Sequence, residues 1–302
     1  MSDQNMYALV FGLSLTICGL IVFAYFYKSK IAFFARTKPH FAVPSAGITK
    51  VVLENGMTVL IFKNSSIPKV LVQIAYDVGS YVESDGERGL AHLIEHMIFK
   101  GTTKMSESDI DEISRKYGAS YNAFTSMDMT SYYFETNKNN WKPFMSILAD
   151  CMQNARFDDQ HLASELKAVI QELKMYKDDY WSMMLEKVDS LLYPANHPYH
   201  YPIIGYKEDL MNVTAENLKR FYKRYYRPDR ATLFVVGDVD PEEVIAQARQ
   251  NFESIEFEGS SSVRQFPTIH PDLVTQHTRF YEDVATEQLG FYWRIPGSRD
   301  KH

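Results

Sequence analysis

The residues with the clearest chemical capability in this sequence form the segment His92-Leu-Ile-Glu-His96. Its pattern, H-x-x-E-H, is the inverse of the commoner H-E-x-x-H zinc motif. On a helix, two imidazoles one turn apart can reach the same Zn²⁺ at about 2.0–2.1 Å, and the carboxylate between them can accept a proton from the metal's water. We therefore predict His92 and His96 as metal ligands and Glu95 as the general base, on a helix over Gly89–Lys100. The alternative is a helix face that is merely solvated.

A zinc site that performs chemistry needs a third protein ligand and keeps its fourth position for water. A helix predicted over Asp159–Asp178 offers Glu165 and Glu172, which lie two turns apart on one side and share that side with Val169 and Tyr176. Carboxylates among apolar residues require cations or a metal as partners. A glutamate on a helix is more often simply solvated, so the prediction of a metal ligand on this helix depends on the motif upstream.

The segment Gly89-Leu-Ala-His-Leu-Ile-Glu-His-Met-Ile-Phe-Lys-Gly-Thr102 resembles the active-site segment of the pitrilysin and insulinase family of zinc metallopeptidases. That family includes mitochondrial processing peptidase and its bacterial relatives. The likeness covers roughly Val51–Phe252, and the other segments that carry it are Asn122-Ala-Phe-Thr125, Glu165-Leu-Lys-Ala-Val-Ile-Gln-Glu172, Pro202-Ile-Ile-Gly205, Tyr226-Arg-Pro-Asp229 and Val236-Gly-Asp-Val239.

The resemblance implies a role for each residue of the predicted metal site. Glu172 lies 76 residues after His96, where the family places its third ligand, so His92, His96 and Glu172 would hold Zn²⁺. Glu95 would activate the metal-bound water and then pass the proton to the leaving amine. Glu165 would be the carboxylate that orients a ligating imidazole.

The resemblance also implies a substrate-binding strand. In this family the Asn-Ala strand is an exposed sheet edge to which the substrate backbone adds, so Asn122 and Ala123 would bind peptide through main-chain hydrogen bonds. From the residues alone, Asn122 is better interpreted as a strand-end residue with a local hydrogen bond. His197 and His200 flank Pro198, which disfavours a helix that would align them, so we expect both to be structural.

The pattern of strands and helices predicts the fold that carries these residues. Asn55-Gly56, between two β-patterned runs, predicts a hairpin over Ile48–Phe62 with a two-residue turn. The other predicted elements are strands at 70–78, 120–125, 131–136, 231–236 and 288–294, and helices at 141–155, 159–178, 215–225 and 241–252. Their mixed order predicts an α+β fold, a mostly antiparallel sheet with helices packed on one face, preceded by one transmembrane helix.

The predicted transmembrane helix is the uncharged run from Met6 to Tyr27. As a helix it would be about 33 Å long, enough to cross a bilayer. No basic stretch precedes it and no A-x-A-like site follows, so an anchor is favoured over a cleaved signal peptide or a buried helix. Four basic residues between 28 and 38 follow the run, which favours a cytoplasmic location for the rest of a single-pass membrane protein.

Composition limits the partners and the organisation of the chain. The 302 residues are 45% hydrophobic and carry 32 Lys+Arg against 38 Asp+Glu, a formal net charge of −6, so we expect a folded core and no nucleic-acid partner. We divide the chain into a membrane anchor with its basic flank (1–39), a zinc-binding catalytic half (40–258), and a linker with the truncated start of a second homologous half (259–302).

Two functions are consistent with this organisation. The first is a zinc-dependent endopeptidase that hydrolyses short or unfolded polypeptides. The second is a non-catalytic or half-enzyme subunit that needs a homologous partner chain, because in the family a second half closes the substrate chamber. The intact H-x-x-E-H motif favours the enzyme.

Overall fold

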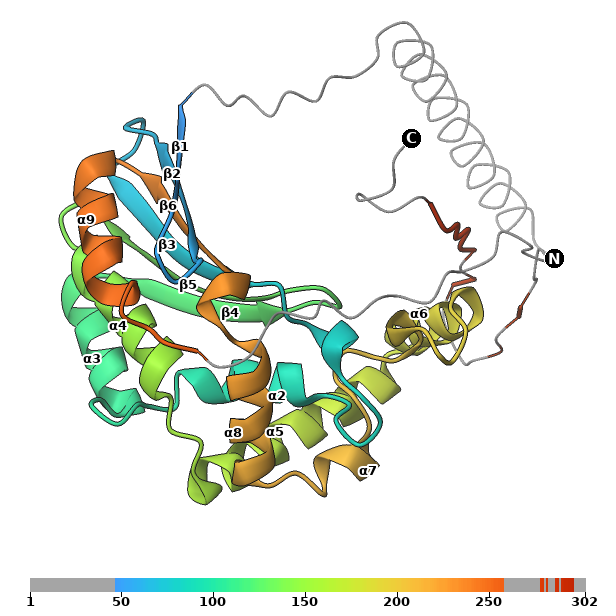
Figure 1. Ribbon diagram of the computed structural model, residues 1–302. Coiled ribbons are helices and arrows are strands. Elements are labelled where there is room, and N and C mark those ends of the chain that lie inside the picture. The colour runs from blue at the N-terminus through green and yellow to red at the C-terminus, as the bar shows by residue number, and fades with distance from the viewer. Residues whose placement is uncertain (1–46, 258–277, 280, 282–285, 288, 296–302) are drawn as a thin grey trace, which may run out of the picture. The chain divides into compact units, whose positions relative to one another are not determined.

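The computed structural model describes residues 47–257, 278–279, 281, 286–287 and 289–295. Residues 47–257 form a six-stranded sheet with helices packed against it (Figure 1). In chain order the elements are β1 (Ile48–Val52), β2 (Thr58–Lys63), β3 (Lys69–Tyr76), η1 (Ser80–Val82), α2 (Leu90–Ile98), α3 (Glu107–Tyr117), β4 (Ser120–Thr125), β5 (Thr130–Asn137), α4 (Trp141–Asn154), α5 (Asp159–Asp178), α6 (Tyr180–Leu192), η2 (Pro198–His200), α7 (Lys207–Leu210), α8 (Ala215–Tyr225), η3 (Pro228–Arg230), β6 (Ala231–Gly237) and α9 (Pro241–Phe252).

The strand order of the sheet is β1-β2-β6-β3-β5-β4. Every neighbouring pair is antiparallel except β2 and β6, which run parallel. The predicted α+β class with a mostly antiparallel sheet is therefore confirmed. Strand β4 is an edge strand, because only β5 pairs with it.

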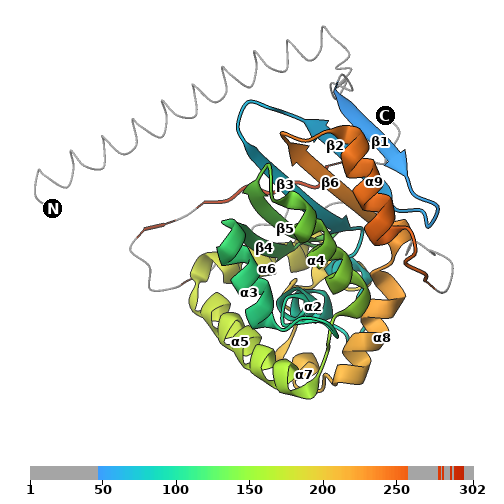
Figure 2. The same cartoon turned by 90° about the vertical axis from the view of Figure 1, so that its left-hand side faces the viewer.

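One face of the sheet carries the hydrophobic core. Along β6, buried residues alternate with half-buried ones, as expected when one face is packed and the other is more open. Helix α4 packs on β3 and β5, α9 packs on β2, and α2 packs on β4 and β5. Figure 2 shows α9 and α4 lying across the sheet. The buried apolar side chains of α2 thus fix the helix that carries the H-x-x-E-H motif.

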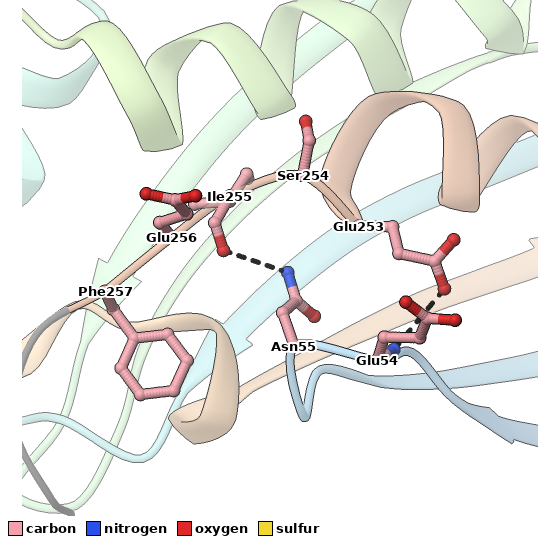
Figure 3. A pocket seen from close by; sticks show the side chains of 7 residues that line it. All are labelled: Glu54, Asn55, Glu253, Ser254, Ile255, Glu256 and Phe257. Carbon is pink, nitrogen blue, oxygen red and sulfur yellow. Dashed lines mark hydrogen bonds between the residues drawn. The ribbon is translucent and has the colours of Figure 1, made fainter.

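The first hairpin has a longer turn than the sequence predicts. The backbone N–H of Leu53 donates to the carbonyl of Met57 at 2.9 Å, which leaves a three-residue loop instead of a two-residue turn at Asn55-Gly56. The reason lies in the side chain of Asn55, whose amide donates to the carbonyl oxygens of Phe252 at 2.7 Å and Ile255 at 3.3 Å. The turn is therefore tied to the end of α9 (Figure 3).

Three helices and one strand differ from the sequence-based expectation. Helices α3, α6 and α7 are not expected from the sequence, because α3 is mostly polar, a single residue separates α6 from α5, and α7 has only four residues. The strand expected at 288–294 is absent from the described residues in that stretch, which have no regular secondary structure.

The membrane prediction requires a correction. In the part of the chain that the structure describes, none of the helices has the length and apolar character needed to cross a bilayer. The run Met6–Tyr27, on which the single-pass anchor rested, lies outside the described residues. The structure therefore does not support the predicted transmembrane helix or the predicted membrane location. The segments 1–39 and 259–302 of the domain division lie largely outside the described residues as well.

Candidate metal and catalytic site

The N-terminal end of α2 is held in place by a buried carboxylate. Glu83 accepts hydrogen bonds from the backbone N–H groups of Gly89 at 3.0 Å and Ala91 at 2.9 Å, two donors that have no partner within the helix. Burial raises the pKa of Glu83, against the opposing effect of these bonds and of Arg88. Gly205 packs so closely that a Cβ there would lie 2.2 Å from the carbonyl oxygen of Arg88. This end of α2 therefore has little freedom to move.

Three predicted ligands converge where α2 packs against α5. Ligand atoms of His92, His96 and Glu172 all lie within 4.8 Å of one another. Oε2 of Glu172 is 3.7 Å from Nε2 of His92 and 3.5 Å from Nε2 of His96. Ligand atoms around a tetrahedral zinc ion with bonds of about 2.0–2.1 Å lie roughly 3.3–3.4 Å apart. The two separations that involve Glu172 are close to this spacing, and the ligand atoms of the two histidines lie within 4.8 Å of each other, so the chemistry of the donor set fits Zn²⁺.

The protonation of His92 suits metal binding. Burial, and to a smaller extent the neighbouring His96, lowers the pKa of His92 to about 4. The ring is therefore neutral at pH 7 and has a nitrogen lone pair to offer a cation. Its Nδ1 atom is buried and has no hydrogen-bond partner among the described residues.

A chain of polar contacts orients His96. Nδ1 of His96 lies 3.3 Å from Oε2 of Glu165, which is buried on α5. The ammonium of Lys100 lies 3.1 Å from Oε1 of Glu165 and donates to Glu107 at 2.8 Å. Burial lowers the pKa of Lys100, but its hydrogen bonds to the two glutamates raise it overall. The contact with Nδ1 leaves Nε2 of His96 as the nitrogen directed toward Glu172.

Glu95 lies on α2 between the two histidines and belongs to the same cluster. The Thr125 hydroxyl, at the end of β4, donates to Oε2 of Glu95 at 2.5 Å. Burial raises the pKa of the Glu95 carboxyl, the Thr125 bond and His96 lower it, and Glu172 raises it. A partly buried carboxylate beside a cation site is the arrangement that general-base chemistry requires.

The predicted substrate residues lie on the exposed sheet edge. Asn122 is exposed, whereas Ala123 is half-buried, as the alternation of β4 requires. The backbone N–H of Ala123 donates to the side-chain oxygen of Asn122 at 2.9 Å. This N–H therefore points away from β5, toward the edge to which another strand could add.

The sequence analysis did not identify Lys100 and Thr125, which contact Glu165 and Glu95, or Glu83, which holds the start of α2. Lys100 lies one helical turn after His96, and this spacing could have predicted that Lys100 lies near the site. Thr125 shares a strand face with Ala123, but its contact with α2 has no sequence signal. Glu83 precedes a polar loop, and its contact with the start of α2 has no sequence signal either.

The two further histidines that we considered are structural, as predicted. Nδ1 of His197 accepts a hydrogen bond from the backbone N–H of Tyr199 at 3.1 Å, and Nδ1 of His200 lies 2.7 Å from the carbonyl oxygen of Tyr193. Neither histidine joins the metal-ligand cluster found among the described residues.

Comparison with known families places most of the chain. Residues 58–205 match insulinase, peptidase family M16, and residues 212–302 match the peptidase M16 inactive domain. The zinc protease YmxG of Bacillus subtilis, itself uncharacterized, is 29% identical over 76% of this chain and 56% of its own length. The zinc protease PqqE of Helicobacter pylori is 31% identical over 68% of this chain and 46% of its own length.

Solved structures give the same picture. A protease from Helicobacter pylori superimposes with a TM-score of 0.69 and 29% identity, over 73% of this chain and 53% of that one. The periplasmic protease PqqL from Escherichia coli gives a TM-score of 0.69 with 27% identity, over 75% of this chain and 26% of that one. The chain thus spans about half the length of its sequence relatives, or less.

Proposed function

Since the chain belongs to the insulinase family, peptidase family M16, we propose that it acts as a zinc-dependent endopeptidase on short or unfolded polypeptides. The observation that supports this most strongly is the convergence of His92, His96 and Glu172 within 4.8 Å, with Glu95 on the same helix. Three protein ligands leave a coordination position for the reaction, unlike the closed four-ligand sites of structural zinc.

In the proposed reaction His92, His96 and Glu172 hold Zn²⁺. When bound, the ion acts as a Lewis acid that polarises the scissile carbonyl and acidifies the attacking water. The carboxylate of Glu95 accepts the proton that this water loses and then donates it to the leaving amine. Glu165 keeps the imidazole of His96 in the tautomer and orientation that direct Nε2 toward the ion.

The edge strand β4 provides the proposed binding surface for substrate. An extended peptide that adds beside β4 would accept a hydrogen bond from the N–H of Ala123, in place of the Asn122 side-chain oxygen that accepts it now. Binding through the main chain depends little on sequence. It does require an extended segment, which folded proteins rarely offer, so short or unfolded polypeptides are the expected substrates.

A second candidate is a half-enzyme subunit that becomes active only with a homologous partner. The observation that favours it is that residues 212–302 match the inactive domain of the same family, which shows that non-catalytic parts belong to this architecture. In both candidates residues 40–258 are the zinc-binding half, and residues 259–302 begin a second homologous half. A partner would add substrate positioning and charge stabilisation, which each affect rate by orders of magnitude.

Peptide hydrolysis by the full chain tests the proposal. The zinc-loaded protein and its Glu95→Gln variant are incubated with a mixture of unstructured peptides, and bound zinc is measured in both. We expect Glu95→Gln to keep one zinc per chain and lose about 10²–10⁴-fold in rate, since it removes the general base. Glu112→Gln, on the exposed surface of α3, is the matched control.

Three outcomes separate the candidates. Cleavage that disappears in Glu95→Gln supports an enzyme that works alone. One bound zinc without cleavage supports the half-enzyme and calls for sedimentation analysis with candidate partner chains. Equal cleavage by both proteins would contradict the role of Glu95.

A further inference from the structure

We propose that Thr125 is a positioning residue that holds the Glu95 carboxylate in its working orientation. This inference rests on the proposed function, because it assigns Thr125 a role only if Glu95 is the general base. Thr125 touches neither the predicted metal ligands nor the scissile bond in the proposed reaction. It acts through Glu95.

The first argument is the hydrogen bond between the two side chains. The hydroxyl of Thr125 donates to Oε2 of Glu95 at 2.5 Å, and the two residues are 30 positions apart in the sequence. A carboxylate only accepts, so the hydroxyl must be the donor. Hydrogen bonds to an ionised oxygen are shorter and stronger than neutral ones. The bond occupies Oε2 and leaves Oε1 as the oxygen that takes a proton from water.

The second argument is the rigidity of the strand end that presents Thr125. Thr125 pairs with Thr130 in the last pair of the β4–β5 ladder. Directly after it, the N–H of Ser126 donates to the carbonyl oxygen of Met129 at 2.7 Å. Thr125 is also β-branched, so its χ1 angle is restricted. The hydroxyl is therefore held at a fixed place beside α2.

A second segment holds the same strand end from another side. The N–H of Ser80 donates to the carbonyl oxygen of Ser126 at 3.3 Å, and the N–H of Tyr81 donates to that of Met127 at 2.9 Å. The contact is so close that a Cβ on Gly79 would lie 2.4 Å from the oxygen of Ser126. Gly79 is thus needed for this approach. The position of Thr125 is fixed by two separate parts of the chain.

The third argument is what Glu95 would do without this bond. Glu95 directly precedes His96 and follows His92 by three residues on α2, so it lies beside the predicted metal ligands. A free carboxylate so close to a cation site could turn toward the ion and become a fourth ligand. Tying Oε2 to Thr125 restrains the side chain and keeps it available as a base.

Two substitutions at position 125 test the role in catalysis. Thr125→Val keeps the shape of the side chain and removes the hydroxyl, whereas Thr125→Ser keeps the hydroxyl. With the full zinc-loaded chain we expect Thr125→Val to lower kcat about 10- to 100-fold with little change in KM or in zinc content, and Thr125→Ser to restore most of the rate. Thr136→Val is the matched control, because the buried Thr136 hydroxyl has no hydrogen-bond partner among the described residues.

A thermal-unfolding cycle tests the bond without any use of activity. Tm is measured for the metal-free wild type, Thr125→Val, Glu95→Ala and the double variant. If the hydrogen bond exists, Thr125→Val lowers Tm by about 2–4 °C more in the wild-type background than in the Glu95→Ala background. Equal shifts in the two backgrounds would overturn the proposal.

The two measurements separate this inference from the proposed function. Loss of kcat in Thr125→Val, its recovery in Thr125→Ser and unequal Tm shifts together support the positioning role. Unchanged kcat in Thr125→Val overturns the role even if the Tm shifts are unequal. Absence of hydrolysis by the wild type counts against an enzyme that works alone, whereas equal Tm shifts in the thermal-unfolding cycle overturn the role of Thr125 whether or not the chain hydrolyses peptides.

Discussion

The two histidines of the candidate site lie one turn apart on α2, yet they are oriented by different means. Their ring centres are 4.8 Å apart and the rings are nearly perpendicular, at 77°. The side chain of His92 is 12% exposed, and its Nδ1 has no partner among the described residues. The side chain of His96 is 24% exposed, and its Nδ1 contacts Glu165, which in turn contacts Lys100.

This difference shows that one site can combine two ways of fixing a ligand. Burial restrains His92 and lowers its pKa, so its ability to bind a cation depends on the packing of α2. His96 is more exposed and depends on a polar network that crosses from α2 to α5. A substitution in the core and one in the network should therefore affect the site through different measurable quantities.

The largest expected effect comes from removing either ring. We expect His92→Ala and His96→Ala each to weaken zinc binding by about a hundredfold or more, since each loses one of three protein ligands. The two variants should differ in the metal-free state, where His92→Ala lowers Tm more because it leaves a space in a buried site. Zinc titration against a chelator and thermal unfolding check both statements. Equal Tm values for the two metal-free variants would contradict the proposal that His92 is held by burial and His96 by a polar network.

The next effect is a pH dependence of stability in the metal-free protein. The pKa of His92 is about 4 in the folded chain, below its ordinary value of 6.5. The unfolded chain therefore binds an extra proton between these values, and stability present above pH 6.5 is lost as pH falls toward 4. We expect a loss of about 3 kcal/mol from this residue. Urea unfolding at several pH values should show a smaller decline for His92→Gln, and an identical decline would refute the assignment.

The smallest expected effect concerns the polar network of His96. Glu165→Gln keeps the size of the side chain and removes its charge, so we expect zinc affinity and hydrolysis to fall about 10- to 100-fold. Lys100→Met should lower zinc affinity and hydrolysis by less, because Lys100 acts on His96 only through Glu165. Glu107→Gln, which alters the other partner of Lys100, is the control. A larger loss of zinc affinity in Lys100→Met than in Glu165→Gln would contradict the proposed order of contacts, in which Lys100 acts on Glu165 and Glu165 acts on His96.

Much of the fold could be predicted because its signals are local. The bounds of α5, α8, α9 and β4 coincide with the predicted ranges, since caps and turn residues mark their ends. Helix α3 has a signal of the same kind, a capping box formed by Ser106 and Asp109 that marks its start. The predicted length of the hairpin turn was wrong because the side chain of Asn55 bonds to the backbone at the end of α9, about 200 positions away. No local sequence pattern reports a contact of this kind.

The sequence by itself determined which groups can do chemistry: the spacing within H-x-x-E-H places two imidazoles and a carboxylate on one side of α2, as helical periodicity requires. Only the tertiary structure decided what surrounds them. It brought Glu172 to the two rings, Glu165 and Lys100 behind His96, and Thr125 against Glu95. These contacts join α2 to α5 and β4, and they depend on how a helix packs on a sheet edge and on its neighbour. Packing of this kind is set by the whole core rather than by any short segment.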